Sequence, residues 1–390
     1  MATFKIRRGM PAGLVGLLAI AMIGLPVSGA GAAQGGSTGK SSGKLSALQS
    51  RMWRPDGTVN VVATHGKSFY IGGDFKNVWN SSLTKSQRRV RIAALSSKTG
   101  APIKAFHPHA NGEVDAIAVF HRALYIGGDF TKVNGKSRHH LAVLRLSTGK
   151  LLPVKGLRLD GPVYSLLHLR NRLYVGGDFR YVGKVHQARL FSVNPSGHLA
   201  EGWPASPRGA NGPVFSLAAA PGHKAVLVGG HFHQLLNKPK VNLGAVSLRG
   251  RLMKWTPPAV CLRDCPVRDL VASRKLVYAG IDGPGGRIRA YRWSTGRTAW
   301  ADKTDGDVDA VALVGDTVLI GGHFTEVSDL AHKMFAIVDS ATGAVSDRVE
   351  TSSGTTFPGI LDIRVSHGVA LLGGAFDDVA GQGRLAAVAP

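Results

Sequence analysis

The segment Leu124–Lys136, with the sequence LYIGGDFTKVNGK, contains the four-residue motif GGDF. This motif is one letter short of GGDEF, the loop signature of enzymes that make cyclic dinucleotides. Its distribution along the chain decides between a nucleotide-cyclising site and a structural role. The motif occurs as GGDF, GGHF or GGAF at Gly72–Phe75, Gly127–Phe130, Gly176–Phe179, Gly229–Phe232, Gly321–Phe324 and Gly373–Phe376.

The variation among the copies argues against catalysis. A catalytic loop is not copied along one chain with its acid exchanged for histidine or alanine, so we interpret the motif as structural. The glycines allow neighbouring backbones to approach and the strand to bend, while the phenylalanine packs between repeats. Asp74, Asp129 and Asp178 are expected to accept backbone N–H bonds in the turn that follows.

The motif marks an internal repeat. Its first glycine, or the equivalent residue, recurs at intervals of 42 to 55 residues, at Gly72, Gly127, Gly176, Gly229, Ala279, Gly321 and Gly373. Each unit holds short runs of Val, Ile, Leu, Tyr and Phe between turns rich in Gly, Asn and Asp, which is typical of short strands. Repeat periods of this length indicate propellers or solenoids. The sequence therefore predicts an all-β fold, a seven-bladed β-propeller with four-stranded antiparallel blades.

The two ends of the repeat region complement each other. The last unit stops at RLAAVAP, after its third expected strand, and has no fourth. The segment LQSRMWRPDGTV near the start resembles the fourth strands of other units. We predict that Leu48–Arg54 completes the last blade and closes the ring, which hides an edge that would otherwise template aggregation.

The chain outside the repeats has a simple organisation. Residues 1–33 combine a basic start, an apolar core and small residues, which is typical of a secretory signal peptide. A retained membrane anchor is the alternative. Residues 34–45 are a flexible linker by composition, and residues 46–390 form one propeller domain. We expect a secreted or cell-wall-associated monomer with no membrane span after signal removal.

The charge of the chain is strongly positive. The 48 Lys and Arg residues outnumber the 24 Asp and Glu residues, which gives a net charge of +24. Loss of residues 1–33 removes three cations and no anions and leaves +21. Such a protein attracts polyanions, although the charge could instead serve solubility alone. Aromatic residues make up 7% of the chain and do not interleave with the cations, so we expect no specific nucleic-acid partner.

The two cysteines, Cys261 and Cys265, lie in the segment CLRDC. A pair of cysteines alone is too few for a zinc site, which takes about four ligands. In an oxidising compartment a small loop disulfide is favoured.

The units resemble a known repeat. Their pattern, GxVxAL followed by LYIGGDFxxVNGxxRxxLARLxxxTG, is clearest in Gly112–Leu146, Gly161–Val193 and Gly306–Val338. It is similar to the delta-sixty repeat and to the propellers of fungal cortical cell-polarity marker proteins, over residues 46–390. The resemblance implies a propeller in a secreted or surface protein and carries no catalytic residue. The fifth unit departs most, with YAGIDGPGG in place of YIGGDF.

One position in each unit is a candidate ligand site. The residue after the leading valine of the first strand should face the central channel, and it varies: Asn60, Asp115, Tyr164, Phe215, Arg268, Asp309 and Leu361. The next position is acidic at Asp269 and Asp362. Such a mixed group could bind a sugar, a cation or a phosphate, or its members could cap one another. Asp115 and Asp309 are weak catalytic candidates, as an acid/base pair within roughly 5–10 Å.

Histidines are a second candidate group. They occur in closely spaced pairs on loops of the same predicted face, as His107 with His109, His139 with His140, and His231 with His233. Such a pair could share a metal with a third ligand, but isolated surface histidines are the simpler interpretation, and we predict no metal and no cofactor. The motifs HExxH and GxSxG and a phosphate-binding glycine loop are absent.

Basic residues are the third group. SQRRVR (86–91), GKSRHH (135–140) and NKPK (237–240) all follow the second strand of their unit and could form a basic rim. We therefore predict a non-catalytic binding or scaffold protein of the cell envelope, which engages an anionic polymer or a protein partner through this loop face. The alternatives are a carbohydrate-active enzyme, a glycan hydrolase or lyase with its site at the channel mouth, and a purely structural surface protein.

Overall fold

The computed structural model describes most of the repeat region. The described residues are 48, 51–153, 156–200, 203, 209–259, 265–283, 286–346, 359–366, 368–379 and 381–388. The predicted signal peptide, the linker and Cys261 lie outside them.

Seven sheets are built on the same antiparallel plan. Each begins with an inner strand, which is β2 (Thr58–His65), β7 (Val114–Phe120), β12 (Val163–Leu169), β17 (Val214–Ala219), β22 (Val267–Ala272), β26 (Val308–Val314) or β31 (Ile360–Ser366). The middle strands are β3 (Ser68–Asp74), β8 (Ala123–Gly128), β13 (Arg172–Gly177), β18 (Ala225–Gly230), β23 (Leu276–Ile281), β27 (Thr317–Gly322) and β32 (Val369–Gly374). The third strands are β6 (Ile92–Ser96), β11 (Leu141–Arg145), β16 (Leu190–Val193), β21 (Leu243–Ser247), β24 (Arg287–Arg292), β30 (Phe335–Asp339) and β33 (Leu385–Val388).

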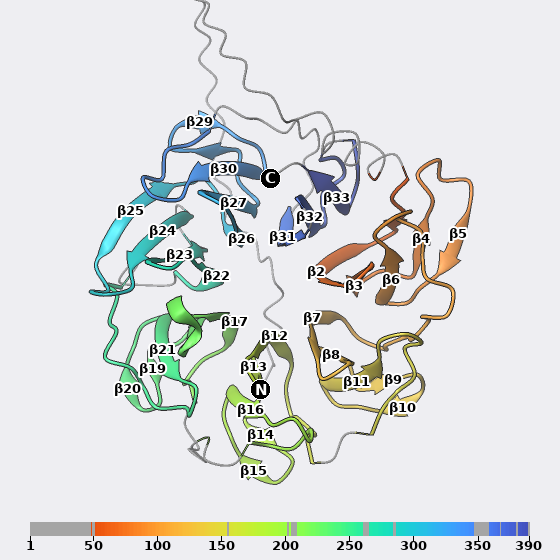
Figure 1. The fold of residues 1–390 in the computed structure, drawn as a ribbon, viewed down its shortest axis with the longest axis horizontal. Coiled ribbons are helices and arrows are strands. Elements are labelled where there is room, and N and C mark those ends of the chain that lie inside the picture. Colours follow the sequence, from red (N-terminus) through yellow and green to blue (C-terminus); the bar gives the residue numbers. More distant parts are fainter. Residues whose placement is uncertain are drawn as a thin grey trace, which may run out of the picture.

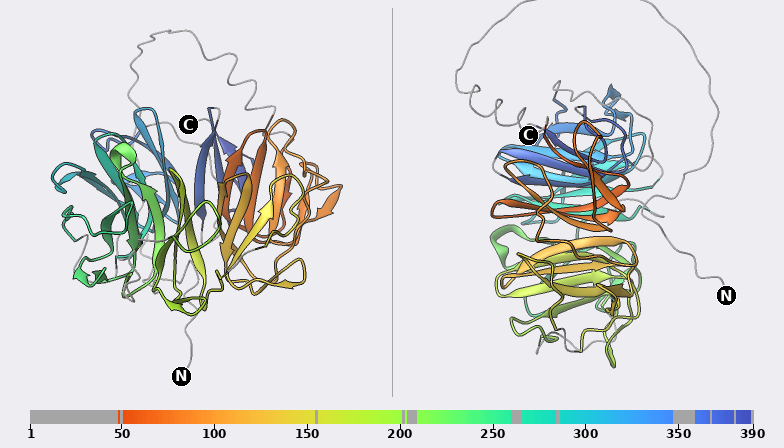
Figure 2. Two further views of the ribbon diagram at one scale, coloured as in Figure 1. Left: turned by 60° about the horizontal axis from the view of Figure 1, so that its bottom comes forward. Right: turned by 90° about the vertical axis from the view of Figure 1, so that its right-hand side faces the viewer.

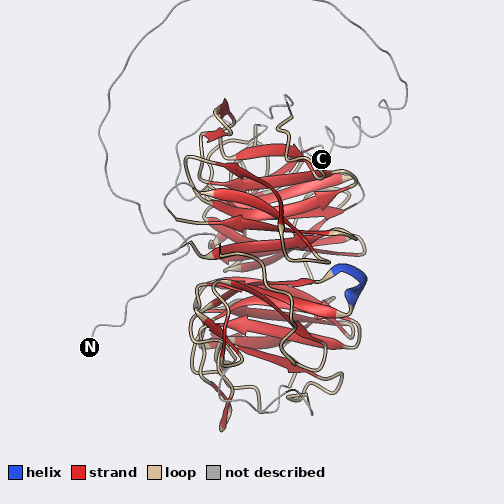
Figure 3. Ribbon diagram, turned by 90° about the vertical axis from the view of Figure 1, so that its left-hand side faces the viewer, coloured by secondary structure: helices blue, strands red, loops and turns tan. Residues whose placement is uncertain are grey.

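Smaller elements lie outside these sheets, and all of the strands among them except β1, which precedes β2, follow a middle strand. They are the sheet of β1 (Arg54–Pro55), β4 (Asn77–Trp79) and β5 (Ser86–Arg88), and the hairpins β9 (Lys132–Val133) with β10 (Lys136–Ser137), β14 (Tyr181–Val182) with β15 (Val185–His186), β19 (Gln234–Leu235) with β20 (Lys238–Pro239), and β28 (Glu326–Val327) with β29 (Leu330–Ala331). A short 3₁₀ turn, η1, covers Pro221–His223. Strands dominate the described chain (Figure 3), so the prediction of an all-β fold is confirmed.

The prediction of four-stranded sheets is wrong for most units. Within the described residues, the sheet of β22 to β24 alone has a fourth strand, β25 (Thr298–Lys303). Elsewhere the outer segment makes a single bridge, such as Leu95 with Pro102 or Leu144 with Leu151. In the first unit the outer segment turns away just after the bridge, where the N–H of Phe106 donates to the Ile103 carbonyl at 3.0 Å. The outer edges are therefore shorter than the sequence pattern indicated.

The sheets surround a common centre, with their inner strands closest to it (Figure 1). Side views show the sheets standing next to one another in one thick layer (Figure 2). Each inner strand contacts the next one along the chain, and β31 contacts β2. The first glycine of the motif makes this contact possible. A Cβ on Gly72 would lie 2.6 Å from Val114 Cγ1 of the next sheet, and one on Gly373 would lie 2.7 Å from Val59 Cγ1 of the first.

The described residues of Leu48–Arg54 do not form the predicted closing strand. Within the described residues β33 pairs with β32 alone, and Arg54–Pro55 pairs with β4 of the first unit. The N–H of Met52 donates to the carbonyl of Leu48 at 2.9 Å, so the chain turns here instead of extending a ladder. Leu48 and Met52 are nevertheless buried in one hydrophobic cluster with Leu371, Leu385 and Ala387 of the last unit. The two ends meet through side-chain packing.

Candidate functional site

The predicted channel position coincides with a β-bulge in every inner strand. In β2, for example, Val59 faces Gly73 and Val61 faces Gly72, which leaves Asn60 as an extra residue. The same shift occurs at Asp115, Tyr164, Phe215, Arg268, Asp309 and Leu361. A bulge re-aims the side chain of its extra residue. Residues from all seven inner strands accordingly line one central cavity.

Several polar groups of the channel bond across neighbouring sheets. Asn60 Nδ2 donates to Asp115 Oδ1 at 2.7 Å, and the N–H of Val62 donates to Asp362 Oδ2 at 2.7 Å. Asp269 accepts a hydrogen bond from Ser216 Oγ at 2.9 Å and another from the N–H of Val311 at 3.0 Å. These groups therefore tie one sheet to the next.

Arg268 is the centre of a buried ionic cluster. Its guanidinium pairs with Asp282, lies 3.8 Å from Asp309 Oδ1 and packs 5.0 Å from the centre of the Phe215 ring. Burial, a hydrogen bond to Asp282 and the charges of Asp282 and Asp309 raise the pKa of Asp307 to about 8. At neutral pH Asp307 is therefore largely protonated and can donate to Asp282. In the fifth unit Asp282 takes the place of the GGDF aspartate.

The channel is narrow at this level. Its cavity has a volume of about 60 Å³, which is room for about two waters and far below the roughly 300–1,000 Å³ of ligand pockets. The Arg364 side chain is 47% exposed because it projects into the channel, and it lies 3.3 Å from Asp362. The charge of Asp362 raises the pKa of Arg364 despite the surrounding protein. Asp115 and Asp309 line the same cavity, but each lies against another side chain.

The histidines do not converge on a metal site. His140 Nδ1 donates to the Gly128 carbonyl at 3.2 Å, and burial lowers the pKa of its imidazole. The rings of His139 and His140, like those of His231 and His233, lie 6.4 Å apart. His107 and His109 are exposed. Among the described residues, no group of three or more His, Cys, Asp or Glu side chains is placed to hold a metal. Cys265 is buried, and the disulfide remains a prediction.

The GGDF aspartates contact side chains of their own unit. Asp74 accepts a hydrogen bond from Arg91 Nε at 3.1 Å, and Asp178 accepts one from Arg189 Nε at 2.8 Å. Asp129 lies 3.8 Å from His140, which occupies the equivalent position. Arg91 and Arg189 each donate further to a carbonyl of the segment that leads into the next sheet, at 3.2 and 3.0 Å. The aspartate thus positions a side chain that links two units.

A different set of residues accepts the backbone N–H bonds. Asp56 accepts the N–H groups of Lys76 and Asn77 at 2.8 and 3.0 Å, and Asp305 accepts those of Thr325 and Glu326 at 2.7 and 2.9 Å. Partial burial alone would raise the pKa of both carboxyl groups, but these hydrogen bonds outweigh it and lower the pKa. Equivalent acceptors are Asn111, Asp160 and Asn211. Their sequence signal is a recurring Asp-Gly or Asn-Gly just before the inner strand.

The hairpins after the middle strands lie on one face. Because a middle strand runs antiparallel to its inner strand, it ends at the edge where that inner strand begins. The segments entering the inner strands bridge to these hairpins, as in Ala110 with Val133 and Ala210 with Leu235. We call this the hairpin face, formed by residues 76–91, 131–140, 180–189, 233–242, 325–334 and 377–384.

The predicted basic rim on this face divides into two kinds of residue. Arg89 and Lys240 are buried, and they donate to the carbonyls of Arg88 and Trp255 at 2.8 and 2.9 Å. Burial lowers the pKa of both side chains. Other cations of the hairpins are exposed: Lys76, Lys85, Arg88, Lys132, Lys136, Arg180, Lys184 and Lys238. The exposed set is available to a partner.

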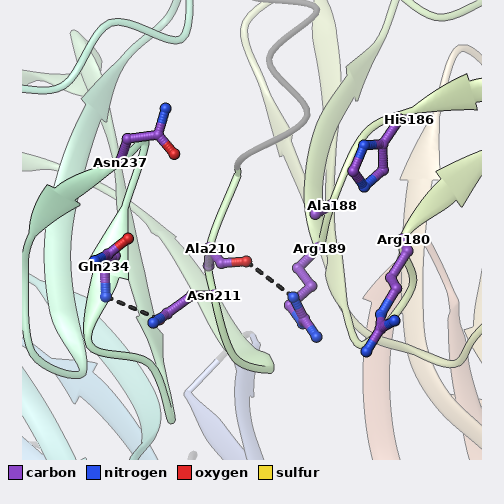
Figure 4. A pocket seen from close by; sticks show the side chains of 8 residues that line it. All are labelled: Arg180, His186, Ala188, Arg189, Ala210, Asn211, Gln234 and Asn237. Atoms are coloured by element: carbon purple, nitrogen blue, oxygen red, sulfur yellow. Dashed lines mark hydrogen bonds between the residues drawn. The ribbon is translucent and has the colours of Figure 1, made fainter.

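A pocket of about 470 Å³ opens on the hairpin face between the third and fourth units. Arg180, His186 and Arg189 lie on one side of it, and Gln234 and Asn237 lie on the other (Figure 4). It is several times larger than the channel cavity. Its position in a gap between two units was not predicted from the sequence, because it needs side chains from both.

Comparison with known proteins supports the fold. No family model matches the chain, and no curated protein matches it. Among solved structures, it is similar to the WD40 β-propeller domain of Doa1, with a TM-score of 0.55 and 13% identity over 85% of this chain and 94% of that one. It is also similar to the computationally designed Ika8 protein, with a TM-score of 0.50 and 12% identity over 88% and 100%. At these identities the similarity concerns the fold alone, and it assigns a β-propeller-like architecture.

Of the described residues, none belong to a helix with the length and apolar character needed to cross a bilayer.

Proposed function

We propose that the seven sheets are the blades of one closed ring related to the delta-sixty-repeat propellers. The contact of β31 with β2 supports this. So does the position of Gly373, which leaves room for Val59 of the first sheet as Gly72 does for Val114 of the second. Because no family model matches the chain, this relationship is supported by the repeat pattern alone.

We further propose that this protein is an exported, non-catalytic binding module that engages an anionic polymer of the cell envelope through its hairpin face. One observation carries this proposal. The hairpin segments of the first four units contain thirteen Lys and Arg residues and no Asp or Glu. Eight of the thirteen are exposed. Like charges gathered on one face raise the local concentration of a polyanion.

The channel supports binding over catalysis. Its cavity of about 60 Å³ is too small for a sugar unit by the usual size of ligand pockets. The weak catalytic candidates Asp115 and Asp309 lie against Asn60 and Arg268. A glycan hydrolase with its site at this place would need the ring to widen. The Cys261–Cys265 disulfide, which remains a prediction, would agree with export.

A polymer-binding assay tests the function. A variant with Lys76, Arg88, Lys136 and Lys184 all changed to Glu is compared with the wild-type chain on a polyanionic envelope polymer at low and high salt. The matched control changes four cations of the opposite turns to Glu: Lys67, Lys98, Lys150 and Arg251. We expect wild-type binding to weaken with salt, the hairpin variant to lose at least 100-fold in affinity, and the control to lose less than five-fold. Equal losses in the two variants would contradict the proposal.

A further inference from the structure

The pocket between the third and fourth units has a set of uncommitted donors around it. Within the described part of the chain, the side chains of Arg180, His186, Gln234 and Asn237 make no hydrogen bond with the protein. They come from both walls, since Arg180 and His186 belong to the β14–β15 hairpin and the carboxamides belong to the next unit (Figure 4). Four groups that can donate therefore surround one open volume.

The rest of the pocket wall is held rigidly. Arg189 Nε donates to Asp178 at 2.8 Å, and its Nη1 donates to the Ala210 carbonyl at 3.0 Å. Asn211 Oδ1 accepts the N–H groups of His233 and Gln234 at 2.8 and 2.9 Å. The His186 ring stacks on Tyr181, with ring centres 4.9 Å apart. These contacts fix both walls before any ligand arrives, which reduces the entropy lost on binding.

The charges around the pocket favour an anion. The acceptor residue before the inner strand is an aspartate in the first, third and sixth units, but here it is the neutral Asn211. The carboxylate of Asp178 is paired with Arg189. Asp160 accepts the backbone N–H groups of Arg180 and Tyr181 and forms no ion pair with the Arg180 guanidinium. The Arg180 charge is thus not neutralised by an ion pair within the described residues.

We propose that this pocket binds a phosphate group carried by a hydroxyl-bearing polymer. This inference rests on the proposed function and names the group that is recognised. Donors from two opposed walls suit a tetrahedral anion, whose oxygens point in several directions, better than a planar carboxylate, which a single guanidinium satisfies in one plane. The volume of about 470 Å³ leaves space beyond the phosphate for neighbouring polyol or sugar units. The carboxamides of Gln234 and Asn237 both donate and accept, as hydroxyl groups require.

The test uses titration calorimetry with two defined polymers at one salt concentration. Poly(glycerol phosphate) is the phosphate probe, and polygalacturonate is the carboxylate probe. Arg180→Gln removes the uncommitted guanidinium, and Arg251→Gln is the control, because Arg251 is an exposed arginine on an opposite turn. Asn237→Asp is a second variant that places a carboxylate in the pocket. Asn237 has a φ of 61°, which aspartate tolerates, so folding should be retained.

We expect Arg180→Gln and Asn237→Asp each to weaken binding of poly(glycerol phosphate) at least ten-fold, with less than two-fold change for Arg251→Gln. Tighter wild-type binding of polygalacturonate than of poly(glycerol phosphate) would overturn the choice of phosphate. If the wild-type chain binds and all three variants bind equally, the pocket is wrong and the proposed function stands. If the wild-type chain binds neither polymer at low salt, the proposed function fails and this inference fails with it.

Discussion

The hairpins of the first four units and the loops of the last two have the same backbone plan but opposite charge. Residues 325–334 and 377–384 contain four acidic residues, Glu326, Asp329, Asp377 and Asp378, and two basic ones, Lys333 and Arg384. The first four hairpins contain thirteen basic residues and no acidic one. The fold therefore does not require the positive charge.

What the backbone plan does require can be seen at one buried position of the hairpin segment, two residues before the place of Arg91 in the first unit. It is occupied by Arg89 in the first unit, Gln187 in the third, Lys240 in the fourth, His332 in the sixth and Gln382 in the last, and all of them are buried. Arg89, Gln187 and Lys240 donate to main-chain carbonyls. Each of these five side chains carries a hydrogen-bond donor, with or without charge, so the position does not require a cation. Constant positions should control stability, and the variable exposed positions should control binding.

The largest effect is expected at the first glycine of the motif, which every unit retains, since the register places Gly280 of the fifth unit here in place of the predicted Ala279. A Cβ on Gly72 would lie 2.6 Å from Val114 Cγ1 and 2.9 Å from Val61 Cγ1. Gly72→Val should lower the free energy of unfolding by about 3 kcal/mol or more, because the two sheets must separate to admit the side chain. Urea denaturation measures it. Gly66→Asn is the control, since Gly66 has open space and a φ of +58°, and a loss there equal to that at Gly72 would contradict the packing argument.

Two adjacent arginines should separate stability from binding. Arg89→Leu leaves the carbonyls of Arg88 and Ile103 without their donor and should cost about 1–3 kcal/mol in unfolding free energy. Arg89→Gln should cost less, because glutamine occupies this place in two other units. Arg88→Gln, at an exposed site, should change stability by less than about 0.5 kcal/mol and weaken polymer binding. Urea denaturation and the polymer-binding assay measure the two effects. A larger loss of stability for Arg88→Gln together with a larger loss of binding for Arg89→Leu would contradict the separation of stability from binding.

The carboxyl pair of Asp282 and Asp307, where the fifth unit meets the sixth, should make the stability of the chain depend on pH. The pKa of Asp307 is about 8 in the folded chain and 3.8 as an isolated group. Folding therefore retains a proton, so this contribution to stability is complete below about pH 4 and is lost as the pH rises through 8. Asp307→Asn can still donate to Asp282 but does not ionise. Its unfolding free energy should fall less between pH 5 and 9 than that of the wild-type chain, by about 1–3 kcal/mol.

Asp305, two residues before Asp307, provides a control for which the pH dependence of stability has the opposite sign. The pKa of Asp305 is lowered in the folded chain, so its contribution is present above pH 4 and is lost as the pH falls below that value. Asp305→Asn places here the residue found at the equivalent positions Asn111 and Asn211. This variant should therefore be less stable than wild type above pH 4, and the two stability curves should converge as the pH falls. Parallel curves for wild type and Asp307→Asn in urea denaturation from pH 5 to 9 would show that the carboxyl pair does not retain the proton.

The fold could be predicted because each unit repeats its apolar pattern and its glycines. The channel residues could be predicted for the same reason, since the bulge follows the leading valine in every unit, as at Asn60 and Asp115. The outer strands could not, because an apolar outer segment can turn away from the third strand after a single bridge, as it does after Pro102. The closing segment failed for a related reason, since sequence similarity to a strand does not exclude the turn at Leu48–Met52.

The sequence also could not show which cations of the basic rim are buried and which are exposed. Arg88 and Arg89 are neighbours of the same type, yet Arg88 is exposed at the end of β5 and Arg89, just beyond the strand, is buried. The pocket between the third and fourth units depends on side chains more than 45 residues apart, Arg180 and Asn237 among them. A single sequence shows which units repeat but not which side chains meet across the gap between two of them.

The smallest expected effect extends the basic half of the hairpin face into the acidic half. Glu326 and Asp329 are exposed in the loop of the sixth unit, and Glu326→Lys with Asp329→Asn raises the local charge by three. The backbone N–H of Glu326 still donates to Asp305, and asparagine suits the φ of 65° at position 329, so the melting temperature should not change. Affinity for the polyanion should rise about two- to five-fold at low salt and not at high salt, because screening removes a contribution that is purely electrostatic. A gain that persists at high salt would mean that the sixth unit makes direct contacts, and the functional division between the two halves of the ring would then be wrong.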